Sequence, residues 1–296
     1  MKNEKKTASA PKSPKLDASN PVSAWQAVEW SRHPARFYTQ DYLDKAFSAW
    51  TEIKGDRSFR EDKALIAGFG TLKPSKEFPK GQSVVFVGHQ KGRKTKEKIE
   101  RNFGMPNPEG YRKAQRAYAL AERFEMPLLT FVDTPGAFPG IGAEERGQSE
   151  AIASSIYNLL SLKVPTLSVV IGEGGSGGAL AMACTDKVLM FRNSTYSVIS
   201  PESCAAILWS NAGKSKDAAV ALKSAANYLK ELNLCDEIID VDFPEVEDNT
   251  ERMADALHLA VSQNLKKLLK LKGEARMKKR FERYRYFDSK FLKGSK

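Results

Sequence analysis

Two glycine-rich segments each directly follow a mostly apolar run, and this order constrains the fold more than any other feature of the sequence. Residues 128–132 lead into Asp-Thr-Pro-Gly at 133–136, and residues 167–171 lead into Gly-Glu-Gly-Gly-Ser-Gly-Gly at 172–178. Short apolar runs that end at glycine or proline predict buried strands. A helix-like segment follows each turn. Because helical crossovers join parallel strands, the sequence predicts an α/β fold with parallel pairing.

Glycine-rich turns from a strand into a helix suit a negatively charged oxygen. The first turn of a helix leaves backbone N–H groups unpaired, and glycine lets a ligand approach the backbone closely. Two such turns at the ends of neighbouring strands predict preformed donors for a developing oxyanion, and this use of glycine requires no nucleophilic side chain. The alternative is that the glycines only permit close packing of helix on strand.

The rest of the chain continues the alternation of strands and helices. Residues 22–51 are rich in aromatic side chains at helical spacing and predict helix. Further strands are predicted at 64–72, 83–89, 187–191, 196–199 and 237–241. Helices are predicted at 108–124, 177–184, 201–209, 217–232 and 251–271.

The formal charge of +11 is concentrated at the two ends of the chain. Residues 1–15 carry five lysines and one acid, and residues 263–296 carry thirteen Lys or Arg and three acids, which leaves the part between them slightly acidic. Residues 1–20 have almost no large apolar side chains, and we expect disorder there. The sequence therefore predicts a disordered basic tail at 1–20, one core domain at 21–262, and a basic helical extension at 263–296.

The cysteines and the hydropathy point to a soluble protein of a reducing compartment. Cys184, Cys204 and Cys235 form no Cys-x-x-Cys pair, and no histidine stands at ligand spacing, so we predict buried thiols rather than disulfides or a metal site. No apolar stretch reaches the length of a membrane span, and the basic N-terminus lacks the apolar segment of a signal peptide. We expect a cytoplasmic protein.

A GTPase-like phosphate site is one reading of Asp-Thr-Pro-Gly at 133–136. Such a site also needs a P-loop, and the nearest candidate, at 88–95, has Arg93 where a glycine should precede the lysine. A charged segment rather than an apolar helix follows it. The sequence disfavours this class.

A serine hydrolase is a second reading, because residues 174–178 satisfy Gly-x-Ser-x-Gly with Ser176 as the nucleophile. The triad order requires a histidine after the serine, and only His258 qualifies. That histidine lies in the middle of a predicted helix, whereas the hydrolase fold places it on a loop. The hydrolase remains the alternative function.

Several longer motifs together resemble one family. They stand at 88–93, 102–106, 131–140, 142–153, 171–181 and 194–202. In this order they resemble the carboxyltransferase subunit alpha of bacterial acetyl-CoA carboxylase, over about residues 25–240, and Arg283-Tyr284 resembles the end of that family. Two departures stand out: a short Lys/Ser/Pro stretch replaces a long charged N-terminal segment, and Ser203 occupies a position where glycine is expected.

The resemblance implies a fold, a reaction and partners. The fold is crotonase-like, with repeated β-β-α units and two roughly perpendicular sheets flanked by helices. The reaction transfers the carboxyl group of carboxybiotin, a co-substrate held on the biotin carboxyl carrier protein, to acetyl-CoA, and forms malonyl-CoA for fatty-acid synthesis. The implied partners are a zinc-bearing beta subunit in an alpha2beta2 heterotetramer, the carrier protein and biotin carboxylase. No cofactor or metal is expected on this chain itself.

The resemblance also assigns roles to the glycines. It implies that Gly177 and Gly178 donate to the biotin ureido oxygen, and that the ureido nitrogen is the base toward acetyl-CoA. Five further glycines are implied in substrate binding or in shaping the loops around it: Gly174, Gly175, Gly136, Gly140 and Gly142. Glu144, Glu145 and Arg146 are expected to fix the first loop by ion pairing.

The basic C-terminal segment, residues 274–293, has two readings. Apolar side chains recur at three- and four-residue intervals, at Met277, Phe281, Tyr284, Phe287 and Phe291, with cations between them. Clustered cations and exposed aromatics would suit nucleic acid. A helix that docks its aromatic face on the core or on a partner, with its cations in water, is the alternative that the regular spacing favours.

Overall fold

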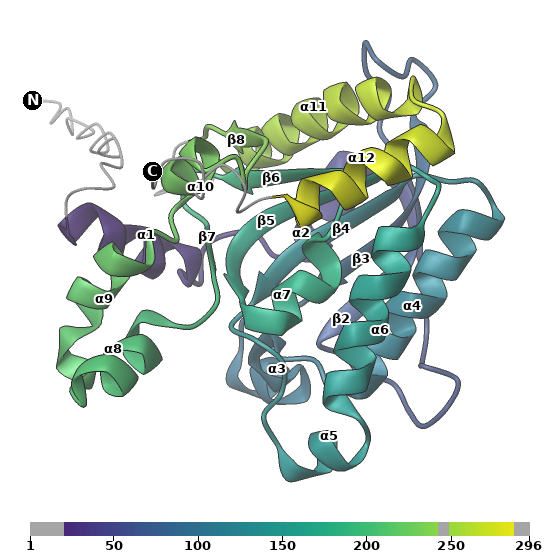
Figure 1. Ribbon diagram of the computed structural model, residues 1–296. Coiled ribbons are helices and arrows are strands. Elements are labelled where there is room, and N and C mark those ends of the chain that lie inside the picture. Colours follow the sequence, from purple (N-terminus) through teal and green to yellow (C-terminus); the bar gives the residue numbers. More distant parts are fainter. Residues whose placement is uncertain (1–20, 242–248, 287–296) are drawn as a thin grey trace, which may run out of the picture.

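The computed structural model describes residues 21–241 and 249–286 of the chain (Figure 1). Within them, eight strands form one sheet in the order β1-β2-β3-β4-β5-β6-β8, and β7 pairs with β5. The strands are β1 (Phe47–Ile53), β2 (Leu65–Leu72), β3 (Gln82–His89), β4 (Leu128–Thr134), β5 (Thr166–Gly175), β6 (Lys187–Phe191), β7 (Thr195–Ser197) and β8 (Glu237–Ile239).

Helices cover both faces of the sheet and extend beyond its edge (Figure 1). They are α1 (Pro21–Ser31), α2 (Thr39–Ala46), α3 (Thr95–Glu100), α4 (Pro108–Arg123), α5 (Ile141–Glu145), α6 (Gln148–Ser161), α7 (Ser176–Ala183), α8 (Pro201–Trp209), α9 (Ser215–Leu222), α10 (Ala226–Glu231), α11 (Asn249–Leu269) and α12 (Gly273–Arg285), with the short 3-10 helices η1 (Asn102–Gly104) and η2 (Ala212–Lys214).

The parallel pairing predicted from the apolar runs is confirmed for the centre of the sheet. Strand β4 pairs in parallel with β3 and β5, and β6 pairs in parallel with β5 and β8. The pairs β1–β2 and β2–β3 are antiparallel. The helix predicted over residues 22–51 was wrong at its end, because Phe47–Ile53 forms the edge strand β1, which leaves much of its outer surface exposed.

Alternate residues of the central strands divide the core into two layers. Leu128 and Val132 of β4 face α4, α6 and α7, whereas Leu129 and Phe131 face α2 and α11. Side chains of successive strand residues point to opposite faces of a sheet, so one strand supplies both layers. Helices α7 and α11 therefore lie on opposite sides of the sheet, which matters for the candidate site.

Strand β5 is longer than predicted and branches the sheet. The glycines at 172–175, expected in a loop, are part of the strand. Its first half, Leu167 to Val170, pairs with β6, and its last three residues pair with β7. The two sheets implied by the resemblance are thus joined here into one hydrogen-bonded sheet, with β7 as the branch. A register shift between Val132 and Thr134 of β4 accompanies this divergence.

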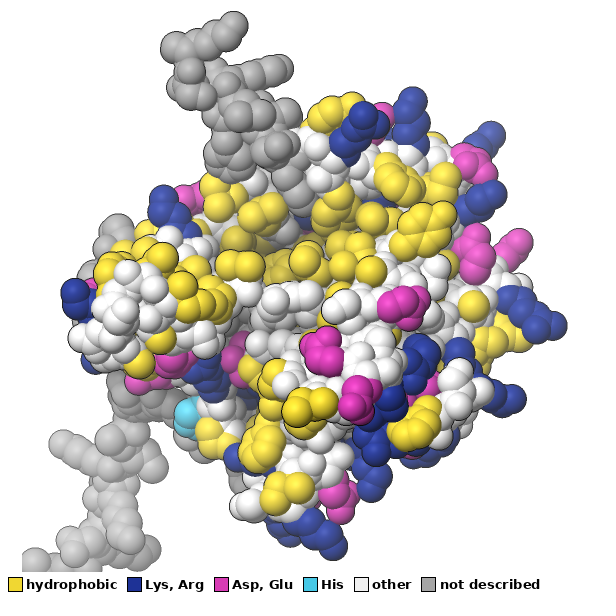
Figure 2. Space-filling view, turned by 60° about the horizontal axis from the view of Figure 1, so that its bottom comes forward, with side chains coloured by type: hydrophobic (Ala, Val, Ile, Leu, Met, Phe, Trp, Pro, Cys, Tyr) yellow, Lys and Arg dark blue, Asp and Glu magenta, His cyan; other side chains and the backbone are white. Residues whose placement is uncertain are grey.

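Helices α1, α8 and α9 form a lobe beside the sheet, with small apolar clusters of their own (Figure 1). Figure 2 shows hydrophobic side chains gathered on this lobe and on the neighbouring surface. Ile207 and Leu208 of α8 are 71% and 63% exposed, and Val198, just after β7, is 74% exposed. The helix predicted at 217–232 is divided into α9 and α10, because Lys223 takes a left-handed conformation with φ 49°.

The C-terminal helix α12 docks on the core, as the preferred reading of the basic segment predicted, but through its arginines. Arg280 is 1% exposed, and its Nη1 donates to the carbonyls of Leu159 and Leu162 at 2.8 and 2.9 Å. Its Nε and Nη2 donate to Asp186 at 2.9 and 2.8 Å. Phe281 is 44% exposed. The expected docking of the aromatic face is confirmed for Tyr284, which packs on the core, but the expectation that the cations stay in water was wrong.

Arginine can donate hydrogen bonds to the carbonyls at the end of a helix, which an aromatic ring cannot do. The last turn of a helix leaves its carbonyls without intrahelical donors, and a guanidinium offers five N–H groups in a fixed plane. Arg276 similarly donates to the carbonyls of Leu268 and Leu271 at the end of α11. These buried arginines make the nucleic-acid reading of the segment unfavourable. Phe287 and Phe291, like residues 1–20, lie outside the described residues.

The three cysteines, Cys184, Cys204 and Cys235, are buried and free, which confirms the prediction of buried thiols. Burial raises the pKa of the Cys184 thiol to about 12, so the group stays protonated. The predicted boundary between residues 262 and 263 falls inside α11. Among the described helices, none is both long and apolar enough to span a membrane.

Candidate oxyanion site

The two glycine-rich turns meet at the carboxyl ends of β4 and β5. Thr134 pairs with Gly174, which places the first turn beside the second. A Cβ atom added at Gly175 would lie 2.1 Å from the Pro135 carbonyl oxygen, and one at Gly178 would lie 2.8 Å from the Gly136 carbonyl carbon. No side chain fits at such distances. Glycine is therefore required at both positions by the contact of two backbones.

Gly177 differs from its neighbours because a Cβ atom would fit there without a clash. A Cβ atom there would meet nothing closer than Ile152 Cγ2 at 3.4 Å, an ordinary contact distance. Gly177 also lines a cavity. Ser176, where α7 begins, has φ 51°, so the chain turns sharply between strand and helix. The first amides of α7 lie at this turn, and a helix supplies no internal acceptor for them.

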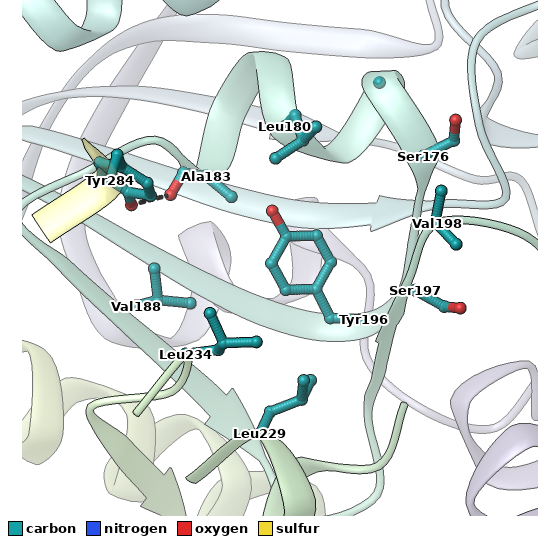
Figure 3. Close-up of a pocket in the computed structure, with 11 residues that line it drawn as sticks. Ser176, Leu180, Ala183, Val188, Tyr196, Ser197, Val198, Leu229, Leu234 and Tyr284 are labelled. Carbon is teal, nitrogen blue, oxygen red and sulfur yellow. Dashed lines mark hydrogen bonds between the residues drawn. The ribbon is translucent and has the colours of Figure 1, made fainter. Parts of the chain in front are cut away.

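The cavity beside Gly177 has a volume of about 370 Å³ and mainly apolar walls (Figure 3). Elements distant in sequence contribute to it: Ser176, Gly177, Leu180, Ala183, Val188, Tyr196, Ser197, Val198, Leu229, Leu234 and Tyr284. The Tyr284 hydroxyl contacts the Ala183 carbonyl at 2.8 Å and the Thr185 carbonyl at 3.0 Å. Burial raises the pKa of Tyr196 well above its ordinary value, so both phenols are neutral at physiological pH.

The other glycines assigned from the sequence are not all at this cavity. Gly174 and Gly175 line a small adjoining pocket with Arg32 and Glu173. Gly136 has φ 152°, which favours glycine, and belongs to the turn that contacts Gly178. Gly140 and Gly142 lie at the start of α5, against the Phe138 ring and the Arg146 guanidinium, and neither contributes to the described walls of either pocket.

Charged side chains lie directly behind the two turns. Arg36 Nη2 donates to both carboxylate oxygens of Asp133 at 2.6 and 2.7 Å, and the two side chains are 3% and 0% exposed. His89 lies beside them, where its Nδ1 accepts the Asp133 amide at 3.3 Å. Burial lowers the pKa of His89 to about 4, so the ring is neutral. Its role here is to accept a backbone hydrogen bond.

Lys91 and Arg32 continue this set of charges along the end of β5. Lys91 Nζ lies 3.1 Å from Asp133 Oδ1 and 2.6 Å from Glu173 Oε1. Arg32 joins Glu173 at 2.9 Å to Glu202 of α8 at 2.7 Å. Burial alone would raise the pKa of Glu173, but the two cations outweigh burial and lower that pKa to about 2. Glu173 is therefore a carboxylate throughout the physiological range.

Our reading of the sequence did not identify these ion pairs. Asp133 and Glu173 each stand at or near the end of a mostly apolar run, where a charge is unusual, and that position was the available signal. The ion pair predicted for the first loop was also only partly correct. Arg146 fixes it as expected, but its partner is Glu109 of α4, whose Oε1 lies 2.7 Å from Arg146 Nε, rather than Glu144 or Glu145.

The geometry does not support a serine hydrolase. The only histidine that follows Ser176 in the sequence, His258, lies on α11, on the opposite face of the sheet from α7. Its Nε2 is 2.8 Å from the Lys73 carbonyl oxygen. His89 is buried and holds a backbone amide, as described above. Among the described residues there is also no group of three or more His, Cys, Asp or Glu placed to hold a metal ion.

Comparisons with known proteins agree with this geometry. The profile of the family described as acetyl co-enzyme A carboxylase carboxyltransferase-like matches residues 4–288. The acetyl-coenzyme A carboxylase carboxyl transferase subunit alpha of Geobacter sulfurreducens is 52% identical over 273 residues, which cover 92% of this chain and 83% of that protein. The corresponding subunit of Thioalkalivibrio sulfidiphilus is 50% identical over 262 residues, or 88% of this chain and 80% of that one.

Solved structures show the same fold at low identity. Transcarboxylase 12S superposes with a TM-score of 0.58 at 19% identity, over 84% of this chain and 46% of its own. The beta subunit of Pseudomonas aeruginosa geranyl-CoA carboxylase gives 0.58 at 17% identity, over 91% of this chain and 48% of its own. This chain thus spans about half the length of either protein. With the extent of the sequence match, these results show that the chain belongs to the acetyl-CoA carboxylase carboxyltransferase family, in which its relatives at about 50% identity are alpha subunits.

Proposed function

We propose that this chain forms the biotin half of a carboxyltransferase active site and acts with a zinc-bearing beta subunit. The reaction would move the carboxyl group of carboxybiotin, presented by a biotin carboxyl carrier protein, to acetyl-CoA and so form malonyl-CoA. The observation that carries this proposal is the start of α7. There the amides of Gly177 and Gly178 follow a sharp turn, and Gly177 lines an apolar cavity.

The chemistry requires a stabilised oxyanion on the biotin side. When the bond between the ureido nitrogen and the carboxyl carbon breaks, CO₂ leaves and negative charge moves to the ureido oxygen. Donors fixed before the reaction stabilise such charge without reorganisation. The Gly177 and Gly178 amides would be these donors. The strand-end contacts of Gly175 and Gly178 with the first turn hold the donors in place.

The remaining steps need no acid or base from this chain. The ureido nitrogen, having lost its carboxyl group, takes a proton from the acetyl methyl group. The resulting enolate carbon then bonds to CO₂, and the beta subunit would stabilise the thioester oxygen. This division of labour fits a cavity whose polar side chains are hydroxyls of serine and tyrosine.

The apolar cavity suits the uncharged rings of biotin. Its volume of about 370 Å³ lies at the lower end of the range of about 300–1,000 Å³ for small-molecule sites. Leu180 and Val188 would exclude water from the ureido group, which strengthens the hydrogen bonds to its oxygen. In this arrangement Gly174 and Gly175 shape the second turn, while Gly136, Gly140 and Gly142 shape the first.

Assembly is the part of the proposal that concerns other proteins. Val198, after β7, lines the cavity, and Ile207 and Leu208 of α8 are further exposed apolar side chains, so a beta subunit could cover both. We propose an alpha2beta2 heterotetramer in the cytoplasm, supplied with carboxybiotin by biotin carboxylase through the carrier protein. The carrier and acetyl-CoA are substrates here rather than bound cofactors.

One assay tests the proposal. The purified chain, given acetyl-CoA and a carboxybiotin donor, should form no malonyl-CoA, and addition of the beta subunit should start turnover. The lone chain lacks donors for the thioester oxygen, whereas the complex has both sets. Robust formation of malonyl-CoA by the lone chain would contradict the half-site. Absence of turnover in a verified complex would contradict the reaction itself.

A further inference from the structure

Six charged side chains form an alternating row behind the two glycine-rich turns, and the middle of this row is Lys91. From one end the order is Arg36, Asp133, Lys91, Glu173, Arg32 and Glu202, with successive charges 2.6 to 3.1 Å apart. Three cations and three carboxylates make the row neutral. It joins the segment after α1 to the ends of β3, β4 and β5 and to the start of α8.

The row is built into the ends of the strands. Between Val132 and Thr134 the pairing of β4 with β5 shifts, and there Asp133 Oδ1 accepts the Glu173 amide at 3.3 Å. A Cβ atom at Gly172 would lie 2.4 Å from Asp133 Oδ1 and 2.5 Å from Arg36 Cζ. Gly172 is therefore the residue that lets the carboxylate and the guanidinium lie flat against the backbone.

Lys91 is the residue in this row whose side chain bridges the two carboxylates at the ends of the central strands. Its ammonium contacts Asp133, one residue before the end of β4, and Glu173, two residues before the end of β5. The three side chains are 13%, 0% and 12% exposed, so water screens the two carboxylates poorly. Without the ammonium, the two carboxylates would repel each other across the gap that sets the distance between the turns.

A strained turn holds the stem of Lys91 in place. Asn102, Phe103 and Gly104 have φ angles of 46°, 56° and 82°, a left-handed run that is costly for the first two residues. A Cβ atom at Gly104 would lie 2.6 Å from Lys91 Cγ and 3.3 Å from the Asp133 carbonyl oxygen. The strained turn thus packs directly over the lysine, and this contact limits the positions that its ammonium can take.

We propose that Lys91 is a positioning residue for carboxyl transfer. By joining Asp133 to Glu173 it fixes the turn after β4 against the turn after β5, and so holds the amides at the start of α7 in the geometry of the transition state. Lys91 need not touch substrate for this role. The inference rests on the proposed function of those amides and adds the residue that keeps them aligned.

The test compares charge removal with restored charge balance in the assembled complex. Lys91→Met keeps the length of the side chain but leaves an excess carboxylate, and we expect kcat to fall 10- to 100-fold while KM for the carboxybiotin donor changes less than threefold. Lys91→Met combined with Glu173→Gln restores neutrality and should recover at least fivefold of that loss. Lys63→Met is the control, because it breaks an ion pair with Glu100 whose partners are 57% and 43% exposed. It should leave both constants unchanged.

The outcomes separate this inference from the proposed function. If the wild-type complex makes malonyl-CoA and folded Lys91→Met keeps more than half of kcat, or if the double variant recovers nothing, Lys91 has no positioning role. If Lys91→Met does not fold, the double variant decides alone: kcat within tenfold of wild type supports the inference, and a folded but inactive double variant overturns it. A wild-type complex without turnover would instead overturn the proposed function.

Discussion

The end of α6 and the start of α7 both present backbone groups that have no partner within their own helix. A side chain binds such groups at the end of α6 but not at the start of α7. At the end of α6, the Arg280 guanidinium binds the carbonyls of Leu159 and Leu162. At the start of α7, no side-chain cap accepts from the first amides among the described residues, and a cavity opens beside Gly177. One helix end serves the stability of the fold, and the other, we propose, serves the reaction.

The largest effect is expected from adding a side chain at Gly178, in the first turn of α7. Gly178→Val would place side-chain atoms against the backbone of Gly136 and Ala137, where even a Cβ atom lies at 2.8 and 2.9 Å. The turns must then separate, and the donors move with them. We expect turnover to fall by at least about 100-fold, the typical cost of losing an oxyanion donor. We also expect the free energy of unfolding to fall by about 1–3 kcal/mol from overpacking.

Malonyl-CoA formation by the complex and a denaturant titration measure these two effects. Gly177→Ala is the matched control, because its Cβ atom fits at 3.4 Å from Ile152 and the amide remains. That variant should retain turnover within about tenfold, since it loses no donor. Near-normal turnover of Gly178→Val would place the oxyanion donors elsewhere.

Removing the Arg280 guanidinium from the end of α6 should affect stability instead. Arg280→Met leaves Asp186 and the α6 carbonyls short of donors in a buried place, and breaking a buried ion pair costs about 3–5 kcal/mol. Denaturant unfolding should show this loss, while KM for the carboxybiotin donor stays unchanged at temperatures where the variant is folded. Lys278→Met on the same helix is the control, because Lys278 is 79% exposed. Equal stability of the two variants would contradict the role given to Arg280.

Acid should weaken the row of charged side chains behind the two glycine-rich turns. The pKa of Glu173 is lowered from 4.5 to about 2, so its contribution to stability is present in full above pH 4.5 and is lost as the pH falls toward 2. A shift of this size corresponds to roughly 3 kcal/mol. Unfolding of wild type and Glu173→Gln, measured between pH 6 and pH 2, should therefore show a difference that shrinks with acid. A difference that does not depend on pH would contradict an ionised Glu173.

The smallest effect is expected at Ser176. Ser176 lines the cavity but has no histidine to activate its hydroxyl, and Ser176→Ala leaves the backbone amides of α7 in place. Turnover should remain within about twofold of wild type, as for a surface substitution that removes no named interaction. Collapse of turnover, together with a covalent adduct on Ser176 detected by mass spectrometry, would revive the hydrolase alternative.

The sequence predicted what local pattern determines. The runs at 128–132 and 167–171 became β4 and β5, and their glycine-rich ends met as expected. Strand β1 was missed because aromatic residues at helical spacing precede it and no glycine or proline separates it from α2. The extension of β5 through Gly172, Gly174 and Gly175 was missed because pairing with β7, rather than propensity, holds it extended.

Long-range contacts account for what the sequence did not show at the site. Arg36 and Asp133 are 97 positions apart, and Lys91 and Glu173 are 82 apart, so no local pattern relates them. In α12, spacing defined an aromatic stripe and a basic stripe, but only the positions of the α6 carbonyls and of Asp186 decide which stripe faces inward. Helical periodicity locates faces and does not identify their partners.

The amide of Gly177 offers the most direct test of the proposal that the start of α7 binds the ureido oxygen of biotin. Ser176–Gly177 is the only serine–glycine pair in the sequence, so labelling serine carbonyls with ¹³C and glycine amides with ¹⁵N isolates one NMR signal, that of the Gly177 N–H. In the active complex with the beta subunit, saturating biotin should move this proton signal downfield, because the amide begins to donate to the ureido oxygen. An unchanged signal in a complex that binds biotin and turns over would contradict the account.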